Sequence, residues 1–393
     1  MRSLTLVLTV SLLQISCAER YMTVPKDYHG QLEALRERCE VYETNAPRFF
    51  LFGMGNRTKY IYKDHLLRNL DSDETFNDFK SVVSDSIVPD NYTVVIMRND
   101  NVMRIVEDEY GVHVVGPHSE YLLEGTSSHI TLPEFEDFVY DKVLKVLHHE
   151  LLINIRNSIA YPNIFVYNRP FYRDAFMATL CLEKTGNTNL LTDWITNIHQ
   201  LYDMANGQAE ADNLGELLYL SSVAGIDEEL LLRLLTEIRL QTMDDGEHKF
   251  LVGITDGVPN SEYATQILKL ALAKSGLSDN YTSSPTPGIY KDLCWFKNMQ
   301  PGQRETTWRP TELIRDERDF PYPYPQWARA HYYDDFKAPM SATDYPLSWE
   351  AFASQAHYEG MAVISSKAVK QNICYPHLWA AAEMFLKLYQ YKR

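Results

Sequence analysis

Cysteine is scarce in this sequence, and the few cysteines are far apart. Their spacing matches neither a zinc site nor a dense disulfide scaffold. If the first one is removed with a signal peptide, the other four allow three pairings, and free buried thiols are an equal alternative. The sequence alone therefore predicts no pairing. The five cysteines are Cys17, Cys39, Cys181, Cys294 and Cys374.

Long hydrophobic runs are also scarce. The one clear run, Leu4 to Leu13, is too short to cross a bilayer as a helix. Arg2 precedes it and small residues follow it, which is typical of a secretory signal peptide cleaved after Ala18. We expect residues 1–18 to be this signal and the mature chain to be secreted, without a transmembrane segment. The partial lipobox "QISC" leaves a bacterial periplasmic protein or lipoprotein, anchored through Cys17, as the alternative.

Basic residues are outnumbered by acidic ones. The chain has 37 Lys and Arg against 53 Asp and Glu, a formal net charge of −16, and no basic cluster longer than its closing "YKR". Nucleic acid and anionic membrane surfaces are repelled by such a charge. We therefore expect no nucleic-acid partner. The proportions of hydrophobic residues, 45%, and charged residues, 23%, are ordinary for a globular protein.

Several catalytic signatures are missing. The sequence has no G-x-S-x-G, no Walker loop and no H-E-x-x-H, and "FGMGNRT" lacks the third glycine and the following helix of a dinucleotide site. His148, His149 and Glu150 are adjacent, and adjacent residues on a helix diverge by about 100 degrees, which is poor geometry for a metal. We expect no metal site and no cofactor.

The first half of the mature chain has the period of strands. Residues 45–120 contain short runs rich in β-branched and aromatic residues, and the turn "NDN" at 99–101 joins two of them as a hairpin. A helix near 72–84 interrupts the predicted sheet, and a short amphipathic helix at 27–42 precedes it. We expect residues 19–130 to form an N-terminal α+β module with a small antiparallel sheet.

The second half has the period of helices. Residues 132–161 predict one long helix or two abutting ones, and paired helices with short loops follow, with stops at Gly186 and Gly207. Residues 277–345 are rich in proline and aromatic residues, and we expect an ordered insertion over one face of the helices. Residues 131–393 are therefore expected to be a helical domain.

Charged residues near two predicted helix starts are candidates for chemistry. In "YNRPFYRDAF" Arg173 and Asp174 open a helix that otherwise has a buried pattern, and a buried charge is costly unless it is paired. They are therefore either a structural tie or part of a site. Glu210 and Asp212 lie just before the next helix, where free N–H groups bind anions; simple capping is the alternative.

A further group lies in "ATDYPLSWEAFASQAHYEGM". Glu350 there fits an ordinary first-turn acid favoured by the helix dipole. His357 and Glu359 lie beside Gly360 at a predicted helix end and are harder to explain as surface charges. A role in a functional site and a purely structural role are equal alternatives for both residues.

The strings "FYRDAF", "EADNLGELLYL" and "PHLWAAAEMFLKL" resemble those of six-hairpin glycosidases, the (α/α)6 toroid enzymes related to glucoamylases, and of an uncharacterised branch of that superfamily. The resemblance covers roughly residues 150–393. It implies a mainly α fold, an (α/α) toroid preceded by the small antiparallel β module. We count roughly nine or ten helices after residue 130 where a full toroid has about twelve, so the expected toroid is incomplete or borrows helices from the N-terminal half.

The resemblance also implies how a sugar binds. An Arg-Asp pair at the mouth of such a toroid grips sugar hydroxyls, which assigns saccharide binding to Arg173 and Asp174, with Tyr172 as a stacking platform. An oligosaccharide or polysaccharide is the implied partner. Phe171-Tyr172 replaces the tryptophan often found before this pair, which weakens the transfer of roles. The other binding candidates are Tyr345, Glu350 and His357.

Catalysis in that superfamily uses two carboxylates. The resemblance implies Glu210 or Asp212 as general acid and Glu359 or Glu350 as base. An inverting hydrolase separates its two carboxyls by roughly 6.5 to 9.5 Å so that water fits between them. We therefore predict a secreted glycoside hydrolase.

Two alternatives belong to other classes. One is a polysaccharide lyase on the same scaffold, with Tyr345, His357 or His331 abstracting the proton and Arg173 neutralising the uronate. The other is a secreted extracellular-matrix or biomineral-associated glycoprotein that has lost catalysis. Three sequons accept N-glycans in a eukaryotic secretory pathway: Asn56, Asn91 and Asn280.

Overall fold

The computed structural model describes residues 49–284 and 377–393, except 73, 80, 100, 126–128, 165, 166, 168, 256, 257, 283 and 391. Several sequence predictions lie outside these residues: the signal peptide at 1–18, the helix at 27–42 and most of the insertion at 277–345. The same holds for a set of candidate site residues and cysteines, namely Cys17, Cys39, Cys294, His331, Tyr345, Glu350, His357, Glu359 and Cys374.

The N-terminal part consists of two antiparallel sheets in which each strand pairs with the next one along the chain. The four-stranded sheet contains β1 (Phe49–Phe52), β2 (Tyr60–Lys63), β3 (Leu66–Asn69) and β4 (Thr75–Asp78). The five-stranded sheet contains β5 (Ser84–Val88), β6 (Thr93–Arg98), β7 (Asn101–Glu107), β8 (Gly111–Val115) and β9 (Glu120–Gly125). The short 3-10 helix η1 (Pro89–Asn91) joins β5 to β6.

Strand alternation buries one face of the five-stranded sheet. Val94, Ile105 and Val114 lie opposite one another on β6, β7 and β8, and all three are buried. The predicted hairpin at 99–101 is confirmed, because Arg98 pairs with Asn101 across a two-residue turn. Asn99 has a φ of 47°, the left-handed conformation that such turns require.

The helix predicted near 72–84 is wrong, because β4 and the start of β5 occupy that segment. The β-branched residues that follow favour a strand instead, and pairing with β6 provides the hydrogen-bond partners that a strand needs.

Helices and short hairpins make up the rest of the described chain. The helices are α3 (Asp141–Ile153), α4 (Tyr172–Thr185), η2 (Thr188–Leu191), α5 (Thr192–Thr196), α6 (Asp212–Ala224), α7 (Glu228–Leu240), α8 (Glu262–Lys274) and α12 (Leu378–Leu388). The hairpins pair β10 (Ile155–Arg156) with β11 (Ile159–Ala160), β12 (Thr242–Asp244) with β13 (Lys249–Leu251), and β14 (Ile254–Thr255) with β15 (Val258–Pro259).

The long helix predicted over 132–161 is only partly present. It ends with α3 at Ile153, and β10 and β11 follow as a hairpin. Asn157 and Ser158 form its two-residue turn with φ values of 52° and 60°. The apolar spacing continues past Ile153, but the left-handed turn reverses the chain and prevents one helix from continuing.

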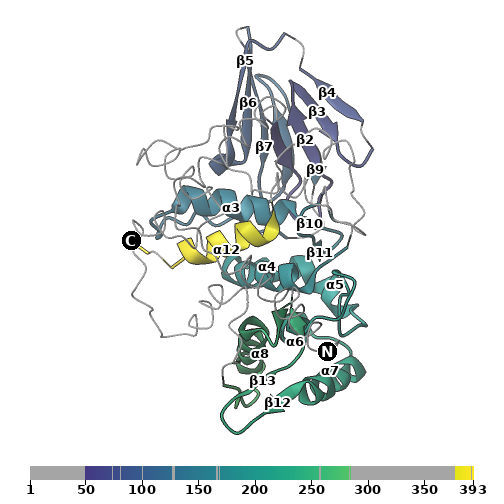
Figure 1. Ribbon diagram of the computed structural model, residues 1–393. Coiled ribbons are helices and arrows are strands. Elements are labelled where there is room, and N and C mark those ends of the chain that lie inside the picture. Colours follow the sequence, from purple (N-terminus) through teal and green to yellow (C-terminus); the bar gives the residue numbers. More distant parts are fainter. Residues whose placement is uncertain are drawn as a thin grey trace, which may run out of the picture.

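The elements are stacked along one direction (Figure 1). The two sheets lie at one end, α3, α12 and α4 form the middle, and α6, α7 and α8 lie at the other end. α12 packs against both α3 and α4, and α6 packs against α4 and α8. A bridge between Phe138 and Lys392 and an ion pair from Arg393 to Asp141 fasten the C-terminus to the start of α3.

The expected mainly α toroid is wrong for the described part of the chain. Those residues contain six helices of eleven to fourteen residues and several antiparallel sheets, one of them five-stranded, which is a mixed α/β fold with far too few helices for an (α/α)6 ring. Helical spacing in the sequence predicted the individual helices α4, α6, α7 and α8. How helices are arranged depends on which faces pack together, and the spacing alone does not determine that.

Gly215 allows α6 and α8 to approach each other closely. A Cβ added to Gly215 of α6 would lie 2.7 Å from the backbone nitrogen of Leu268 on α8. We expect Gly215→Ala to lower the free energy of unfolding by about 1–3 kcal/mol in urea titrations, although alanine favours a helix by roughly 1 kcal/mol. Gly125→Ala, whose Cβ lies at ordinary contact distance from Leu122, is the control. Equal stability of the two variants contradicts the close packing.

Candidate functional site

The charge of Arg173, at the start of α4, is paired with carboxylates at the start of α6. Arg173 is buried, and its Nε donates to Asp212 Oδ2 at 2.8 Å. One of its terminal nitrogens lies 2.7 Å from the same oxygen and 3.2 Å from Glu210 Oε2. The cost of burying a guanidinium is thus offset by two carboxylates that lie almost forty residues further along the chain.

Asp212 is the most enclosed member of this group. It is fully buried at the first position of α6, and its second oxygen, Oδ1, accepts a hydrogen bond from the Thr255 hydroxyl at 3.2 Å. Thr255 belongs to β14 and is itself fully buried. Because both oxygens of Asp212 are engaged, this residue ties α4, α6 and β14 together and holds Arg173 in place.

Glu210 lies where the buried group meets an exposed loop. Its side chain is buried, and Oε2 accepts hydrogen bonds from Arg173 and, at 2.8 Å, from Nδ2 of Asn206. Asn206 itself is exposed. Of the two acids predicted in this segment, Glu210 is therefore the one next to the surface.

Asp203 was not predicted, although it caps α4. Its Oδ2 accepts the backbone N–H of Tyr172 at 2.7 Å, and Oδ1 accepts that of Ala205 at 2.8 Å. Burial raises the pKa of Asp203, while these hydrogen bonds oppose the shift. A local capping pattern cannot reveal a cap that lies thirty-one residues after the helix start.

Glu216 is a second acid that the sequence analysis missed. It is fully buried one turn into α6, where Oε2 accepts from Asn213 Nδ2 at 3.1 Å and Oε1 from the Tyr263 hydroxyl at 3.3 Å. Burial, helped by the charge of Asp212, raises the pKa of Glu216 well above its usual value. The spacing of Asn213 and Glu216 is that of a capping box, which predicts a helix start and not a buried acid.

These residues form what we call the Arg173 cluster: Arg173, Asp203, Glu210, Asp212 and Glu216. The carboxylates of Glu210 and Asp212 contact the guanidinium, and those of Asp203 and Glu216 interact with its charge, so the cluster contains more acidic groups than one cation can neutralise. Protonation of the acids with raised pKa values reduces that imbalance. The cluster therefore brings hydrogen-bond donors, hydrogen-bond acceptors and exchangeable protons together in a buried environment of low dielectric constant.

The other predicted binding residues of α4 are enclosed. Asp174 is buried beside Arg173. Tyr172 is only 4% exposed, its ring packs edge-on against Trp194 with centroids 6.1 Å apart, and its hydroxyl donates to the Gln200 carbonyl at 2.9 Å. The stacking role predicted for Tyr172 therefore has no open ring face in this structure.

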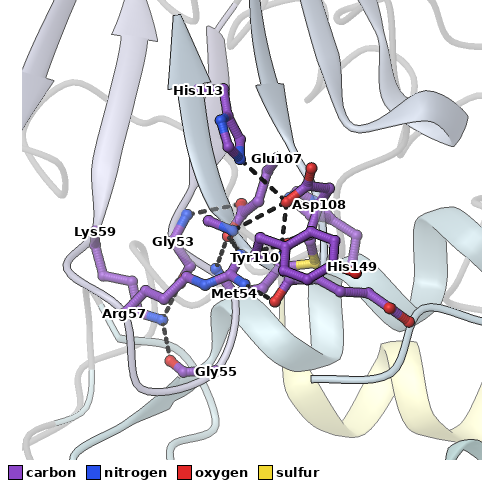
Figure 2. Close-up of polar contacts among 12 residues, drawn as sticks. Gly53, Met54, Gly55, Arg57, Lys59, Glu107, Asp108, Tyr110, His113 and His149 are labelled. Atoms are coloured by element: carbon purple, nitrogen blue, oxygen red, sulfur yellow. Dashed lines mark hydrogen bonds and ion pairs between the residues drawn. The ribbon is translucent and has the colours of Figure 1, made fainter. Parts of the chain in front are cut away.

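A second buried cluster surrounds the loop Gly53–Lys59 (Figure 2). Glu107, at the end of β7, accepts the backbone N–H groups of Gly53 at 2.8 Å and Met54 at 2.6 Å, and the Arg57 guanidinium at 2.8 Å. Arg57 also donates to the carbonyl oxygens of the two residues after Glu107, each at 2.7 Å.

Lys59 binds backbone carbonyls of this loop on its buried side. Its ammonium is fully buried and donates to the carbonyls of Gly53 and, at 2.6 Å, Gly55. Burial lowers the pKa of Lys59 to about 7, opposed by the charge of Glu107. The N–H groups of Gly53 and Met54, which in a phosphate loop face the ligand, are already bound to Glu107, so this cluster acts as an internal structural tie.

The histidines of α3 are core residues that point to different neighbours. Nε2 of His149 lies 3.0 Å from the Leu51 carbonyl, and its ring stacks on Phe50; Nε2 of His148 lies 3.2 Å from Asn187. Glu150 is buried and neither carboxyl oxygen has a hydrogen-bond partner. Among the described residues, no three His, Cys, Asp or Glu side chains are grouped so as to hold a metal ion.

The three sequons differ in exposure. Asn56 accepts the Ser158 N–H at 2.6 Å and donates Nδ2 to the Ser158 hydroxyl and the Leu190 carbonyl, both at 3.3 Å. Asn91 and Asn280 are exposed. A glycan on Nδ2 of Asn56 competes with these internal hydrogen bonds, whereas the other two sites are open.

Cys181 is a free, buried thiol on α4. Within the described ranges, no helix combines the length and apolar character needed to cross a membrane. No protein-family model, curated protein or solved structure matches this chain.

The ion pairs of Arg173 have a stability consequence. We expect Arg173→Met to lower the free energy of unfolding by about 3–5 kcal/mol, because the carboxylates of Asp212 and Glu210 stay buried without their cation. Urea unfolding of Arg233→Met, on the exposed face of α7, provides the control, with a change within about 0.5 kcal/mol. A loss below about 1 kcal/mol for Arg173→Met means that the cluster tolerates an unpaired charge.

His149 predicts acid sensitivity. Burial lowers its pKa from 6.5 to about 3, so its contribution to stability is complete above pH 6.5 and is lost as the pH falls toward 3. Each pH unit in this window costs about 1.4 kcal/mol. In urea titrations at several pH values, His149→Gln is expected to reduce the slope by about 1.4 kcal/mol per pH unit, because the buried His148 and His377 still contribute to it, while His65→Gln, which is half exposed, leaves the slope unchanged. Identical slopes in wild type and His149→Gln contradict the assignment.

Proposed function

We propose that this chain is an exported carbohydrate-active hydrolase whose Arg173 cluster binds a saccharide and exchanges a proton with it. The observation that carries this proposal is the pairing of one buried guanidinium with Glu210 and Asp212 from the start of another helix. Guanidinium and carboxylate groups together donate to and accept from sugar hydroxyls. Hydrolysis of a glycosidic bond in turn needs carboxyl groups to move protons.

The contacts of Asp212 and Glu210 indicate different roles for these two acids. Asp212 uses both oxygens to hold Arg173 and Thr255, so we assign it a positioning role. Glu210 lies beside the exposed Asn206, so we assign it the proton transfer. A group that transfers protons to a substrate must come within hydrogen-bond reach of it, and Glu210 is nearer the surface.

Glu210 and Asp212 do not form an inverting pair with each other. Both have an oxygen within 3.2 Å of one nitrogen of Arg173. Their contacting oxygens are therefore closer together than the roughly 6.5 Å that leaves room for a water in inverting enzymes. The second catalytic carboxylate must come from another segment, and Glu359 or Glu350, both outside the described residues, stays the predicted one.

The charge balance favours a neutral saccharide over a uronic acid. A lyase uses a cation to neutralise the uronate of its substrate. Arg173 already contacts two carboxylates, and Asp203 and Glu216 add acidic groups to the same cluster. An anionic substrate is repelled by such surroundings. We therefore propose hydrolysis of a neutral oligosaccharide or polysaccharide.

The test is a screen of the purified chain without residues 1–18 against neutral and uronic-acid polysaccharides. Reducing ends and the ultraviolet absorbance of unsaturated products are read together. On a substrate that is cleaved, we expect Glu210→Gln to lower kcat about 10²- to 10⁴-fold, because the proton-transferring group is lost. Asp212→Asn is expected to raise KM as well, since Arg173 loses its anchor.

Glu228→Gln is the matched control, because Glu228 is an exposed acid in the first turn of α7. Activity of Glu210→Gln within twofold of wild type contradicts the proposed role of Glu210. Ultraviolet absorbance from unsaturated products shows that the chain cleaves its substrate by β-elimination and contradicts hydrolysis. No product from any polysaccharide on a broad panel favours the non-catalytic extracellular glycoprotein.

A further inference from the structure

An exposed loop lies directly beside the buried Glu210. Residues 204 and 206–209 are exposed, whereas Glu210 is only 2% exposed. Both ends of the loop are anchored. Asp203 donates its backbone N–H to Asn213 Oδ1 at 3.2 Å, and Ala211 donates its own to the Ile254 carbonyl at 2.9 Å. The loop therefore has a fixed base and a solvated tip.

The tip contains a turn with two left-handed residues. Met204 has a φ of 54° and Gly207 a φ of 77°, and the Gly207 N–H donates to the Met204 carbonyl at 3.0 Å. The Met204 side chain is 43% exposed. Ala205 is buried, but residues 206–209 are all exposed. A segment with solvated side chains and little buried apolar surface opens locally at low free-energy cost.

Asn206 connects this tip to the cluster. Its amide Nδ2 donates to Glu210 Oε2 at 2.8 Å. Asp212 is held differently, by two nitrogens of Arg173 and by Thr255, none of which belongs to the loop. Movement of the tip therefore releases a contact of Glu210 and leaves the tie between Arg173 and Asp212 intact.

We propose that residues 206–209, which follow the buried Ala205, form a gate over Glu210 and that the side chain of Asn206 is its latch. In the closed state the loop shields the carboxylate from solvent. When the hydrogen bond from Asn206 breaks and the tip moves away, Glu210 becomes accessible beside a guanidinium that keeps its position. That the opening admits a saccharide rests on the function proposed above.

The test measures the accessibility of Glu210 without any substrate. The folded chain is treated with a water-soluble carbodiimide and glycine ethyl ester, which convert accessible carboxyls to amides, and labelling rates are read by peptide mass spectrometry. The variant is Asn206→Ala, and Gln208→Ala, in the same exposed loop, is the matched control. Glu216, fully buried away from the loop, and Glu247, with a side chain 86% exposed, are the internal references.

We expect Asn206→Ala to increase the labelling rate of Glu210 about tenfold or more, as loss of a hydrogen bond to a charged group predicts. Gln208→Ala is expected to match wild type, and Glu216 to stay unlabelled in all three proteins. An unchanged Glu210 rate in Asn206→Ala overturns the latch. A parallel rise at Glu216 overturns the gate as well, because the whole helical part has then loosened.

Asn206→Asp is the second variant. Its carboxylate cannot donate to Glu210 and repels it, so we expect a Glu210 labelling rate at least as high as in Asn206→Ala. A rate at the wild-type level contradicts the latch. Because labelling needs no saccharide, the gate is tested even if no polysaccharide is cleaved, and the activity of Glu210→Gln tests the proposed function whether or not the loop moves.

Discussion

The pairing of Arg173 with Asp212 is the interaction on which the helical part depends. A guanidinium at the start of a buried helix is unfavourable without an anion, and Asp212 provides that anion from the first position of α6. Thr255 extends the tie to β14. One ion pair thus sets how α4 and α6 begin relative to each other, and it brings Glu210 and Asp203 to the same place.

The structure contains two buried clusters of arginine and carboxylate, and they differ in what surrounds them. Around Glu107 the loop Gly53–Lys59 supplies two N–H groups, Arg57 and the neighbouring Lys59, so the carboxylate is enclosed by its own chain. Around Arg173 the acids outnumber the cation, and one of them, Glu210, contacts an exposed loop. Proton transfer requires contact with a substrate, which favours the second cluster as the functional one.

Sequence patterns predicted single helices and turns better than they predicted how these elements pack together. The hairpin at 99–101 and the helices α4, α6, α7 and α8 follow from turn residues and apolar spacing, whereas the helix predicted to stop at Gly207 is wrong, because α5 already ends at Thr196. The helix near 72–84 is wrong because pairing with β6 makes the end of that segment a strand, and the toroid is wrong because helix spacing does not determine which helices pack together. Asp203 was missed because the helix start that it caps lies thirty-one residues earlier, and Glu216 because Tyr263, the second partner of its carboxylate, lies on α8.

The sequence by itself determined that Arg173 needs an anionic partner, because its helix is apolar and an unpaired charge there is costly. It also marked Glu210 and Asp212 as acids near a helix start. Only the tertiary structure decided which acid anchors Arg173 and which lies beside the surface. That choice depends on the distances between α4, α6 and β14, which are set by packing between segments far apart in the chain.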